Sequence, residues 1–276
     1  MHTPPFPDAP IGVFDSGLGG LSILRHIRAR LPHEHLIYVA DAGYAPYGDK
    51  SDDVVAARSL AVARFLVARG IKALVVACNT ATVAAVKVLR EHFPDMPIVG
   101  VEPGLKPAAA ASRNGKVGVL ATAGTLAGAK FLRLRDEVSG ATQAEFLLQP
   151  CRGLVERIEA NDAEGTTAML RRYVTPLVEQ GVDTLVLGCT HYPLVKASIE
   201  QVAAEAGAAG ITLVDTGEAV TRQLVRLLEA GGLLRADASP GSLEAYTSAS
   251  ATALSAAFNV LVGIDPPVHE ATFDEA

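Results

Sequence analysis

Two apolar runs that each end in a cysteine, GIKALVVAC at residues 70–78 and GVDTLVLGC at residues 181–189, determine the predicted fold. Aligned without a gap, the two runs share their first glycine, a central Leu-Val and the final cysteine. A second pair of segments, IGVFDSG at 11–17 and VGVLATA at 117–123, repeats in the same order at nearly the same offset. Two pairs of similar segments, separated by nearly equal distances along the chain, indicate a duplicated structural unit.

The segments around these runs alternate between short apolar stretches and longer amphipathic ones. The apolar stretches read as strands and the amphipathic ones as helices. Strands that are apolar on both faces and separated by helices are typical of parallel sheets covered on both sides. We therefore predict an α/β protein of two similar, doubly wound parallel-sheet lobes, related by a pseudo-two-fold duplication.

The predicted lobes are not each continuous in sequence. We expect residues 10–101 plus 212–262 to form the first lobe, which contains Cys78, and residues 102–211 to form the second, which contains Cys189. The segment EPGLKP at 102–107 is the expected crossing point between them. We expect residues 1–9 and 263–276 to be loose terminal segments at the surface.

The bulk composition narrows the classes of protein. Hydrophobic residues make up 49% and charged residues 20%, the balance of a globular protein. The formal net charge of −6 provides no basic surface for nucleic acid. Three cysteines fit reduced thiols better than a disulfide framework, and we find neither a signal peptide nor a membrane-spanning stretch. We expect a soluble, cytoplasmic protein that binds neither nucleic acid nor membrane.

Polar residues cluster at the predicted carboxyl ends of the strands, where ligands bind in open α/β sheets. These groups are Asp15-Ser16, Asp41, Cys78-Asn79-Thr80 and Cys189-Thr190-His191. If the lobes are duplicates, they place one cysteine on each side of a shared cleft. We predict the active site in that cleft.

Two opposed thiols suit proton transfer at carbon. A thiol at the start of a helix is favoured as thiolate by the helix dipole. One thiolate can remove a hydrogen from a carbon while the opposite thiol delivers a proton to the other face, which inverts the configuration. His191 is placed to assist Cys189 and Asp15 to assist Cys78, and because Asp15 aligns with Ala121 the two halves are not chemically symmetrical.

Other residues receive plainer interpretations. A cysteine in an apolar strand is most often an inert core residue, and we interpret Cys151, which has no counterpart in the repeat, as structural. His33 and His35 flank Glu34 without a further ligand at suitable spacing, so we predict no metal site. The glycines of DSGLGG lack the spacing of a nucleotide-binding loop.

Four segments together resemble bacterial glutamate racemase, a member of the cofactor-independent aspartate/glutamate racemases: FDSGLGGLS at 14–22, PYG at 46–48, ACNTAT at 77–82 and LGCTHYPL at 187–194. The resemblance spans about residues 11 to 262. It implies that Cys78 and Cys189 are the catalytic acid/base thiols, each serving one direction of the reaction, with Asp15 and His191 assisting them. It also implies a set of residues that line the substrate site: Asp15, Ser16, Tyr47, Gly48, Asn79, Thr80, Thr190 and His191.

The family also has a catalytic glutamate in a segment that begins with Cys-Pro. Here that segment is CRGLVERIE at 151–159, with Arg152 in place of proline, and Glu159 is the matching acid. The resemblance further implies a cytoplasmic homodimer that makes D-glutamate for peptidoglycan without pyridoxal phosphate or a metal.

Three alternatives remain open at this point. An aspartate racemase, or another racemase of the superfamily, differs in substrate by features that motif spacing does not reveal. A two-lobed amino-acid binding module would bind glutamate without chemistry. A dithiol redox protein is disfavoured because the two cysteines are far from Cys-x-x-Cys spacing.

Overall fold

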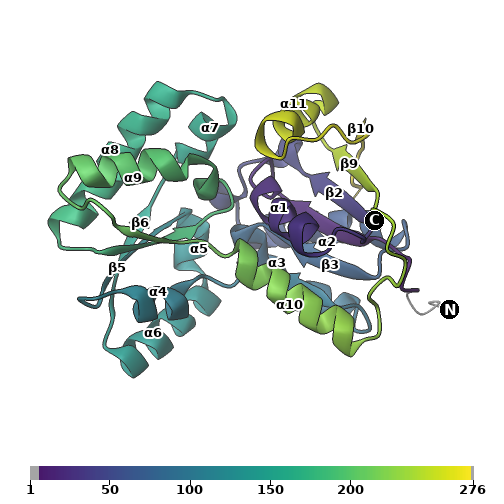
Figure 1. The fold of residues 1–276 in the computed structure, drawn as a ribbon, viewed down its shortest axis with the longest axis horizontal. Helices are drawn as coiled ribbons and strands as arrows, with labels where there is room; N and C mark the ends of the chain where they lie inside the picture. The colour runs from purple at the N-terminus through teal and green to yellow at the C-terminus, as the bar shows by residue number, and fades with distance from the viewer. Residues whose placement is uncertain (1–5, 275–276) are drawn as a thin grey trace. The chain divides into compact units, whose positions relative to one another are not determined.

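A computed structural model describes residues 6–274 of the chain. The chain divides into two compact units, residues 1–101 with 217–276 and residues 102–216 (Figure 1). We call them unit 1 and unit 2.

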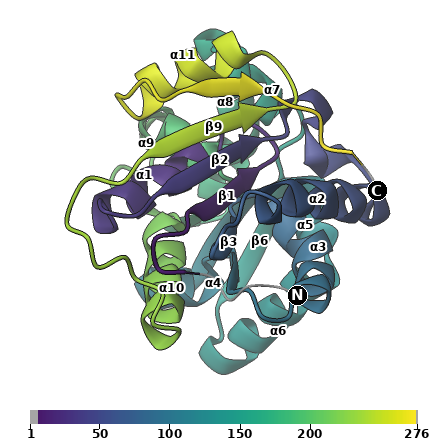
Figure 2. The same ribbon diagram turned by 90° about the vertical axis from the view of Figure 1, so that its right-hand side faces the viewer.

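Unit 1 is built on a six-stranded, fully parallel sheet with the strand order β10-β9-β2-β1-β3-β4. Figure 2 shows β9, β2, β1 and β3 side by side in this order. The strands are β1 (Ile11–Asp15), β2 (Leu36–Ala40), β3 (Ala73–Val76), β4 (Ile98–Gly100), β9 (Leu243–Thr247) and β10 (Val268–Glu270).

Helices cover both faces of this sheet, and each face has its own apolar core. One core joins the sheet to α1 (Leu21–Arg30), α10 (Gly217–Ala230) and α11 (Ala251–Leu261). The other joins it to α2 (Asp52–Val67) and α3 (Asn79–His92) (Figure 2). The central strands β1, β2 and β3 are buried along their whole length, which explains their unbroken apolar sequences.

Unit 2 has a four-stranded parallel sheet with the order β6-β5-β7-β8. Its strands are β5 (Lys116–Ala121), β6 (Glu145–Pro150), β7 (Thr184–Gly188) and β8 (Thr212–Val214). One face packs on α7 (Leu154–Glu159), α8 (Ala163–Glu179) and α9 (Lys196–Glu205). The other packs on α4 (Leu105–Ala111), α5 (Ala123–Ala127) and α6 (Ala129–Thr142) (Figure 1).

The same strand order occurs in both units. The order β2-β1-β3-β4 in unit 1 corresponds to β6-β5-β7-β8 in unit 2. The repeated glycines, Gly70 and Gly181, each precede the cysteine strand with φ of +73° and +86°, a conformation that favours glycine. The prediction of an α/β protein with two similar parallel-sheet lobes is confirmed.

The C-terminal segment differs from its prediction as a loose terminus. Residues Val268–Glu270 form β10, which pairs with β9, and the Phe273 side chain is only 4% exposed. A three-residue strand carries too little sequence pattern to be recognised, because its position depends on pairing with a distant strand. The predicted loose residues 1–5 and 275–276 lie outside the described residues.

The second boundary of unit 2 also differs from the prediction. Strand β8 pairs with β7, with Thr212 opposite Thr184, so residues 212–216 belong to unit 2 rather than to the first lobe. Near the first boundary, the expected crossing segment contains the start of helix α4, with Pro107 in its first turn, where a missing backbone N–H costs no hydrogen bond.

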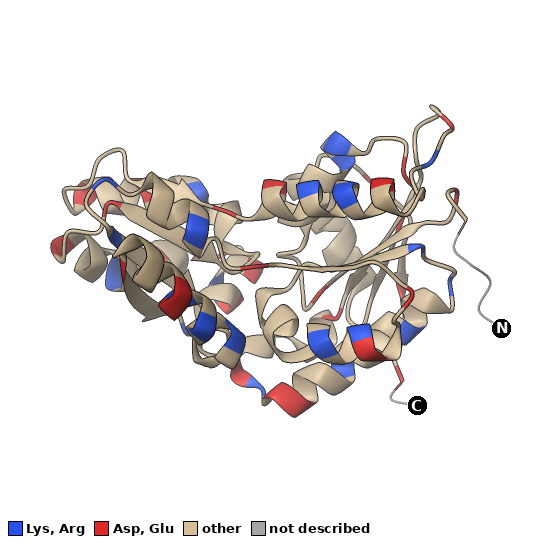
Figure 3. Cartoon of the chain, turned by 90° about the horizontal axis from the view of Figure 1, so that it is seen from below, with Lys and Arg blue, Asp and Glu red and all other residues tan. Residues whose placement is uncertain are grey.

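Acidic and basic residues are mixed along the helices of both units (Figure 3). The excess of negative charge is therefore not gathered on a single helix. Among the described residues, no helix has the length and apolar character needed to cross a membrane.

Candidate active site

Cys78 lies at the carboxyl end of the sheet in unit 1, beside the end of β1. Strand β1 pairs with β3, and Ala77 N donates a hydrogen bond to Phe14 O (2.7 Å), which places Cys78 next to Asp15 and Ser16. Cys78 is the N-cap of α3, and its Sγ accepts a hydrogen bond from Ala81 N (3.4 Å). Ser16 Oγ lies 3.5 Å from the same sulfur. A backbone N–H, a hydroxyl and the helix dipole all favour the thiolate form of Cys78.

Asp15 is fully buried at the end of β1. Its Oδ1 accepts a hydrogen bond from Gly17 N (2.8 Å). A Cβ at Gly20 would lie 2.5 Å from Asp15 Cβ, so the glycine lets helix α1 begin directly against this aspartate. Gly20 of DSGLGG therefore serves the close packing of the buried Asp15 side chain.

Asn79 and Thr80 form the first turn of α3 and are both buried. The Asn79 Nδ2 atom is buried and has no hydrogen-bond partner among the described residues. A buried amide donor without a partner costs free energy unless a ligand or water accepts its hydrogen bond. This donor therefore marks a position where a polar group of a ligand fits.

The PYG segment also lies in unit 1, where Tyr47, Gly48 and Asp49 form the short 3-10 helix η2. Tyr47 is buried in the same apolar core as Cys78. Its hydroxyl donates a hydrogen bond to Asp41 Oδ2 (2.5 Å), so it is committed to a protein partner. Burial, together with the neighbouring negative charge of Asp41, raises the pKa of Tyr47 far above its usual value.

Cys189 occupies the corresponding place in unit 2, directly after β7. Cys189 Sγ lies 3.7 Å from His191 Nδ1, and His191 Nε2 lies 2.8 Å from Glu159 Oε1. Glu159 is the last residue of α7. The side chains of a thiol, an imidazole and a carboxylate are thus aligned, and Thr190 is buried beside them.

The charge of His191 depends on these two neighbours. Burial by itself lowers the pKa of His191, but the hydrogen bonds to Cys189 and to Glu159 outweigh it. The pKa of His191 is therefore held well above its ordinary value. In this arrangement Glu159 favours the imidazolium form of His191.

Cys151 is the third free thiol and has a different environment. It is buried in the apolar core of unit 2, and its Sγ donates to Gln149 O (3.4 Å). Burial raises the pKa of Cys151 to about 12. It therefore remains a protonated thiol at neutral pH, which agrees with its interpretation as structural.

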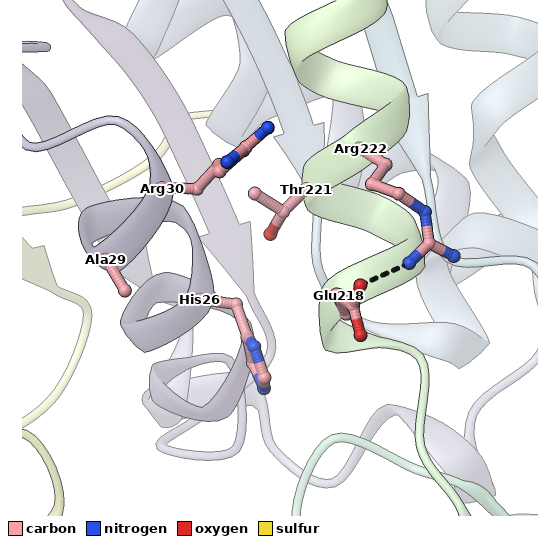
Figure 4. A pocket seen from close by; sticks show the side chains of 6 residues that line it. All are labelled: His26, Ala29, Arg30, Glu218, Thr221 and Arg222. Atoms are coloured by element: carbon pink, nitrogen blue, oxygen red, sulfur yellow. Dashed lines mark hydrogen bonds and ion pairs between the residues drawn. The ribbon is translucent and has the colours of Figure 1, made fainter.

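Two cavities of unit 1 lie away from these residues. One, of about 380 Å³, lies between α1 and α10 and is lined by His26, Ala29, Arg30, Glu218, Thr221 and Arg222 (Figure 4). Another, of about 440 Å³, adjoins the amino ends of β2 and β9, where Leu36 and Ser242 lie. Neither contains a predicted site residue. Within residues 6–274, no group of three or more His, Cys, Asp and Glu side chains is arranged to hold a metal ion.

The sequence analysis did not identify the partners of Asp41. Arg58 of α2 and Ser248, which follows β9, both donate hydrogen bonds to its carboxylate. Arg58 does carry a signal in the sequence, because it lies three residues after buried Val55 and four before buried Val62, on the apolar face of the helix. A charged residue on such a face requires a buried partner.

Comparison with known proteins agrees with the motifs. The family model for Asp/Glu/Hydantoin racemase matches residues 20–224. The chain is 56% identical to a glutamate racemase of Pseudomonas paraeruginosa over 82% of this chain and 84% of that one. It is 49% identical to a glutamate racemase of Ectopseudomonas mendocina over 95% of this chain and 97% of that one.

Two solved structures show the same fold. Glutamate racemase RacE1 of Bacillus anthracis superposes with a TM-score of 0.85 at 30% identity, covering 96% of this chain and 97% of that chain. The Escherichia coli glutamate racemase superposes with a TM-score of 0.81 at 34% identity, covering 95% of this chain and 97% of that chain. The chain therefore belongs to the Asp/Glu/Hydantoin racemase family, within its group of glutamate racemases.

Proposed function

We propose that this chain interconverts L- and D-glutamate by direct proton transfer at the α-carbon, with Cys78 and Cys189 as the two acid/base groups. The observation that carries the proposal is the repeated placement of a cysteine at the carboxyl end of a parallel strand, once in each unit. In this proposal one cysteine from each unit acts on the same substrate molecule. In a member of this family, such a reaction supplies D-glutamate for peptidoglycan.

The reaction consists of two proton transfers. A thiolate on one face of the substrate takes the α-hydrogen as a proton, and the electron pair of the C–H bond passes to the α-carbon. The thiol on the opposite face then donates its proton to that carbon. Each turnover leaves the proton on the other cysteine, and exchange with water restores the starting state. Each cysteine is thus the base for one enantiomer and the acid for the other.

The surroundings of each thiol support this role. The hydrogen bond from Ala81 N and the hydroxyl of Ser16 stabilise a thiolate at Cys78, and Asp15 is buried at the adjoining strand end. At Cys189, His191 accepts the thiol proton and, once protonated, stabilises the thiolate. Glu159 contacts the other ring nitrogen and holds the imidazole in its orientation. These groups tune the two thiols by different means.

Further residues serve to bind the substrate. The unpartnered Nδ2 of Asn79 and the amino end of α3 are suited to a carboxylate. We assign Ser16, Tyr47, Gly48, Thr80 and Thr190 to the same binding site. The solved Escherichia coli and Francisella tularensis glutamate racemases contain L-glutamate and D-glutamate respectively. Their ligands support glutamate as the substrate here.

Isotope exchange tests the proposal directly. Incubation of either enantiomer in deuterated water should yield both enantiomers of glutamate, with deuterium at the α-carbon. A variant with both Cys78→Ala and Cys189→Ala should show neither exchange nor interconversion, whereas Cys151→Ala, the matched removal of a third thiol, should retain both. Exchange that persisted in the double variant would refute the two-thiol mechanism.

We also propose that the enzyme acts in the cytoplasm as a homodimer, as the resemblance to glutamate racemases implies. Light scattering coupled to size-exclusion chromatography measures the mass in solution. A mass near twice the 28.7 kDa of one chain is the expected result, and the mass of one chain would contradict the dimer. Fractionation of the producing cells tests the compartment.

A further inference from the structure

A buried ion pair lies behind the PYG segment in unit 1. Arg58 is 4% exposed and Asp41 is fully buried. Arg58 Nη2 donates to Asp41 Oδ1 (2.9 Å), and Arg58 Nε donates to Asp41 Oδ2 (3.1 Å). Such a two-point pairing fixes the plane of the carboxylate as well as its position. A buried ion pair by itself seldom stabilises a fold. The other hydrogen bonds of Asp41 and Arg58 therefore indicate what this pair does in the protein.

Two further side chains donate hydrogen bonds to the Asp41 carboxylate, and one of them, Tyr47, belongs to the predicted substrate site. Asp41 Oδ2 accepts from the Tyr47 hydroxyl (2.5 Å), and its Oδ1 accepts from Ser248 Oγ (2.7 Å). Tyr47 is followed by Gly48, and both are assigned to substrate binding above. Tyr47 also packs in the core that contains Cys78 and is close enough that a negative charge on that sulfur raises the pKa of Tyr47. Asp41 thus fixes the segment that adjoins the catalytic thiol.

The C-terminal segment completes the surroundings of Arg58. Arg58 Nη1 donates a hydrogen bond to Phe273 O (2.7 Å). The guanidinium is therefore held at one side by Asp41 and at another by the backbone of the C-terminal segment. The Phe273 ring packs against Phe65, with ring centroids 4.9 Å apart. Strand β10 and the hydrogen bond from Ala271 N to Thr247 O (2.9 Å) anchor this segment on β9. Pairing at the edge of the sheet therefore determines where Phe273 O meets Arg58.

We propose that Asp41, Arg58 and the C-terminal segment 268–274 act as positioning residues, which hold Tyr47 and Gly48 in the geometry that binds the substrate beside Cys78. They act through Tyr47 and do not touch the reacting atoms. This proposal rests on the proposed function. It gives the C-terminal segment a role in activity that its position in the sequence does not indicate.

Two variants test the proposal: removal of residues 271–276, and Arg58→Lys, which keeps the charge but loses the two-point geometry. Both should raise KM for each enantiomer about fivefold or more and change kcat less. The reason is that a misplaced binding segment weakens binding of the substrate equally in the ground state and in the transition state. Circular dichroism and Tm monitor folding.

A destabilised control separates positioning from general loss of stability. Lys72 and Glu34 form a second buried ion pair in unit 1, beside Pro10 at the amino ends of the strands. Lys72→Met removes the cationic partner of Glu34, which keeps the hydrogen bond from Arg235 N, and should lower Tm while KM stays close to that of the wild type. If the truncation and Arg58→Lys lower Tm without raising KM above this control, the proposal is overturned.

A double-mutant cycle tests the route through Tyr47. Tyr47→Phe removes the hydroxyl that Asp41 holds. If Arg58 acts through this contact, Arg58→Lys should raise KM much less in the Tyr47→Phe background than in the wild type. Equal effects in the two backgrounds would overturn the proposal. A wild-type chain that did not racemise glutamate would instead contradict the proposed function, so the two failures are distinguishable.

Discussion

The surroundings of Cys78 and of Cys189 differ although the two units share a strand order. Cys78 is contacted by a hydroxyl and a backbone N–H, neither of which changes charge near neutral pH. Cys189 is contacted by His191, a titratable group held by the carboxylate of Glu159. In the aligned repeats His191 corresponds to Thr80, and Ala121 corresponds to Asp15. The two units thus share the position of the thiol and differ in the groups that contact it.

The backbone arrangement of the two units can therefore be kept while the polar groups around the thiol change. The strand, the cysteine and the following helix or turn form one structural module that both units keep. The side chains that differ around the thiols come partly from other elements: Ser16 follows β1 in unit 1, and Glu159, which contacts His191, comes from α7 in unit 2. A site with unequal acid/base environments can match thiols of different proton affinity to the two directions of one reaction.

The largest expected effect comes from removing either thiol. Cys78→Ala and Cys189→Ala should each lower kcat for racemisation by about 10³-fold or more, because positioned acid/base groups contribute on that scale. Under the proposed mechanism, each single variant retains the thiol that acts on one enantiomer. We expect residual deuterium exchange at the α-carbon with one enantiomer in Cys78→Ala and with the opposite enantiomer in Cys189→Ala, measured by NMR. Exchange of the same enantiomer by both variants would contradict two opposed thiols.

A smaller effect is expected from Glu159→Gln, which alters only the Cys189 side. The charge of Glu159 helps to raise the pKa of His191, so its loss should lower that pKa and shift the His191-dependent limb of the kcat profile to lower pH. We expect kcat near neutral pH to fall about 10-fold to 100-fold. Glu156→Gln, an exposed change on the same helix, is the matched control and should leave the profile in place.

The same variant has a predicted effect on stability. The folded-state pKa of His191 is raised, so its charged form stabilises the fold fully below its ordinary pKa of about 6.5, and this contribution is lost as pH rises through the raised value. The difference in free energy of unfolding between the wild type and Glu159→Gln should therefore be largest near pH 6 and shrink at alkaline pH. Urea denaturation across this range measures it, and a difference that grew with pH would be inconsistent with a charged His191.

The smallest effect on catalysis is expected from Cys151→Ala. This thiol lies in the core of unit 2 and stays protonated, so its removal should lower the free energy of unfolding by about 1–2 kcal/mol through lost packing. We expect kcat to stay within about twofold of the wild type. Urea denaturation and steady-state kinetics check both values. A large loss of kcat with little loss of stability would place Cys151 in the catalytic chemistry.

The sequence predicted the parts of the site that depend on local pattern. The cysteines at the ends of apolar runs and the glycine-rich turn after β1 are such patterns, whereas the PYG segment was assigned to the site through the family resemblance. The Glu159 assignment depended on a resemblance with Arg152 in an unexpected place, and the contact of Glu159 with His191 appears only in the structure. The polar network of Asp41 was missed, because Arg58, Ser248 and Phe273 are distant in sequence and meet only through sheet pairing.

The parallel α/β architecture, the duplication and the place of the two cysteines after strands could all be predicted from the amino-acid sequence, because apolar runs, glycine turns and helix starts are local patterns that recur in the two halves of the chain. The pairing of β10 with β9, the place of β8 in unit 2 and the hydrogen bond from Arg58 to Phe273 O depend on the three-dimensional fold. Those features rest on hydrogen bonds between segments far apart in the chain, which leave almost no periodic pattern in the residues that form them.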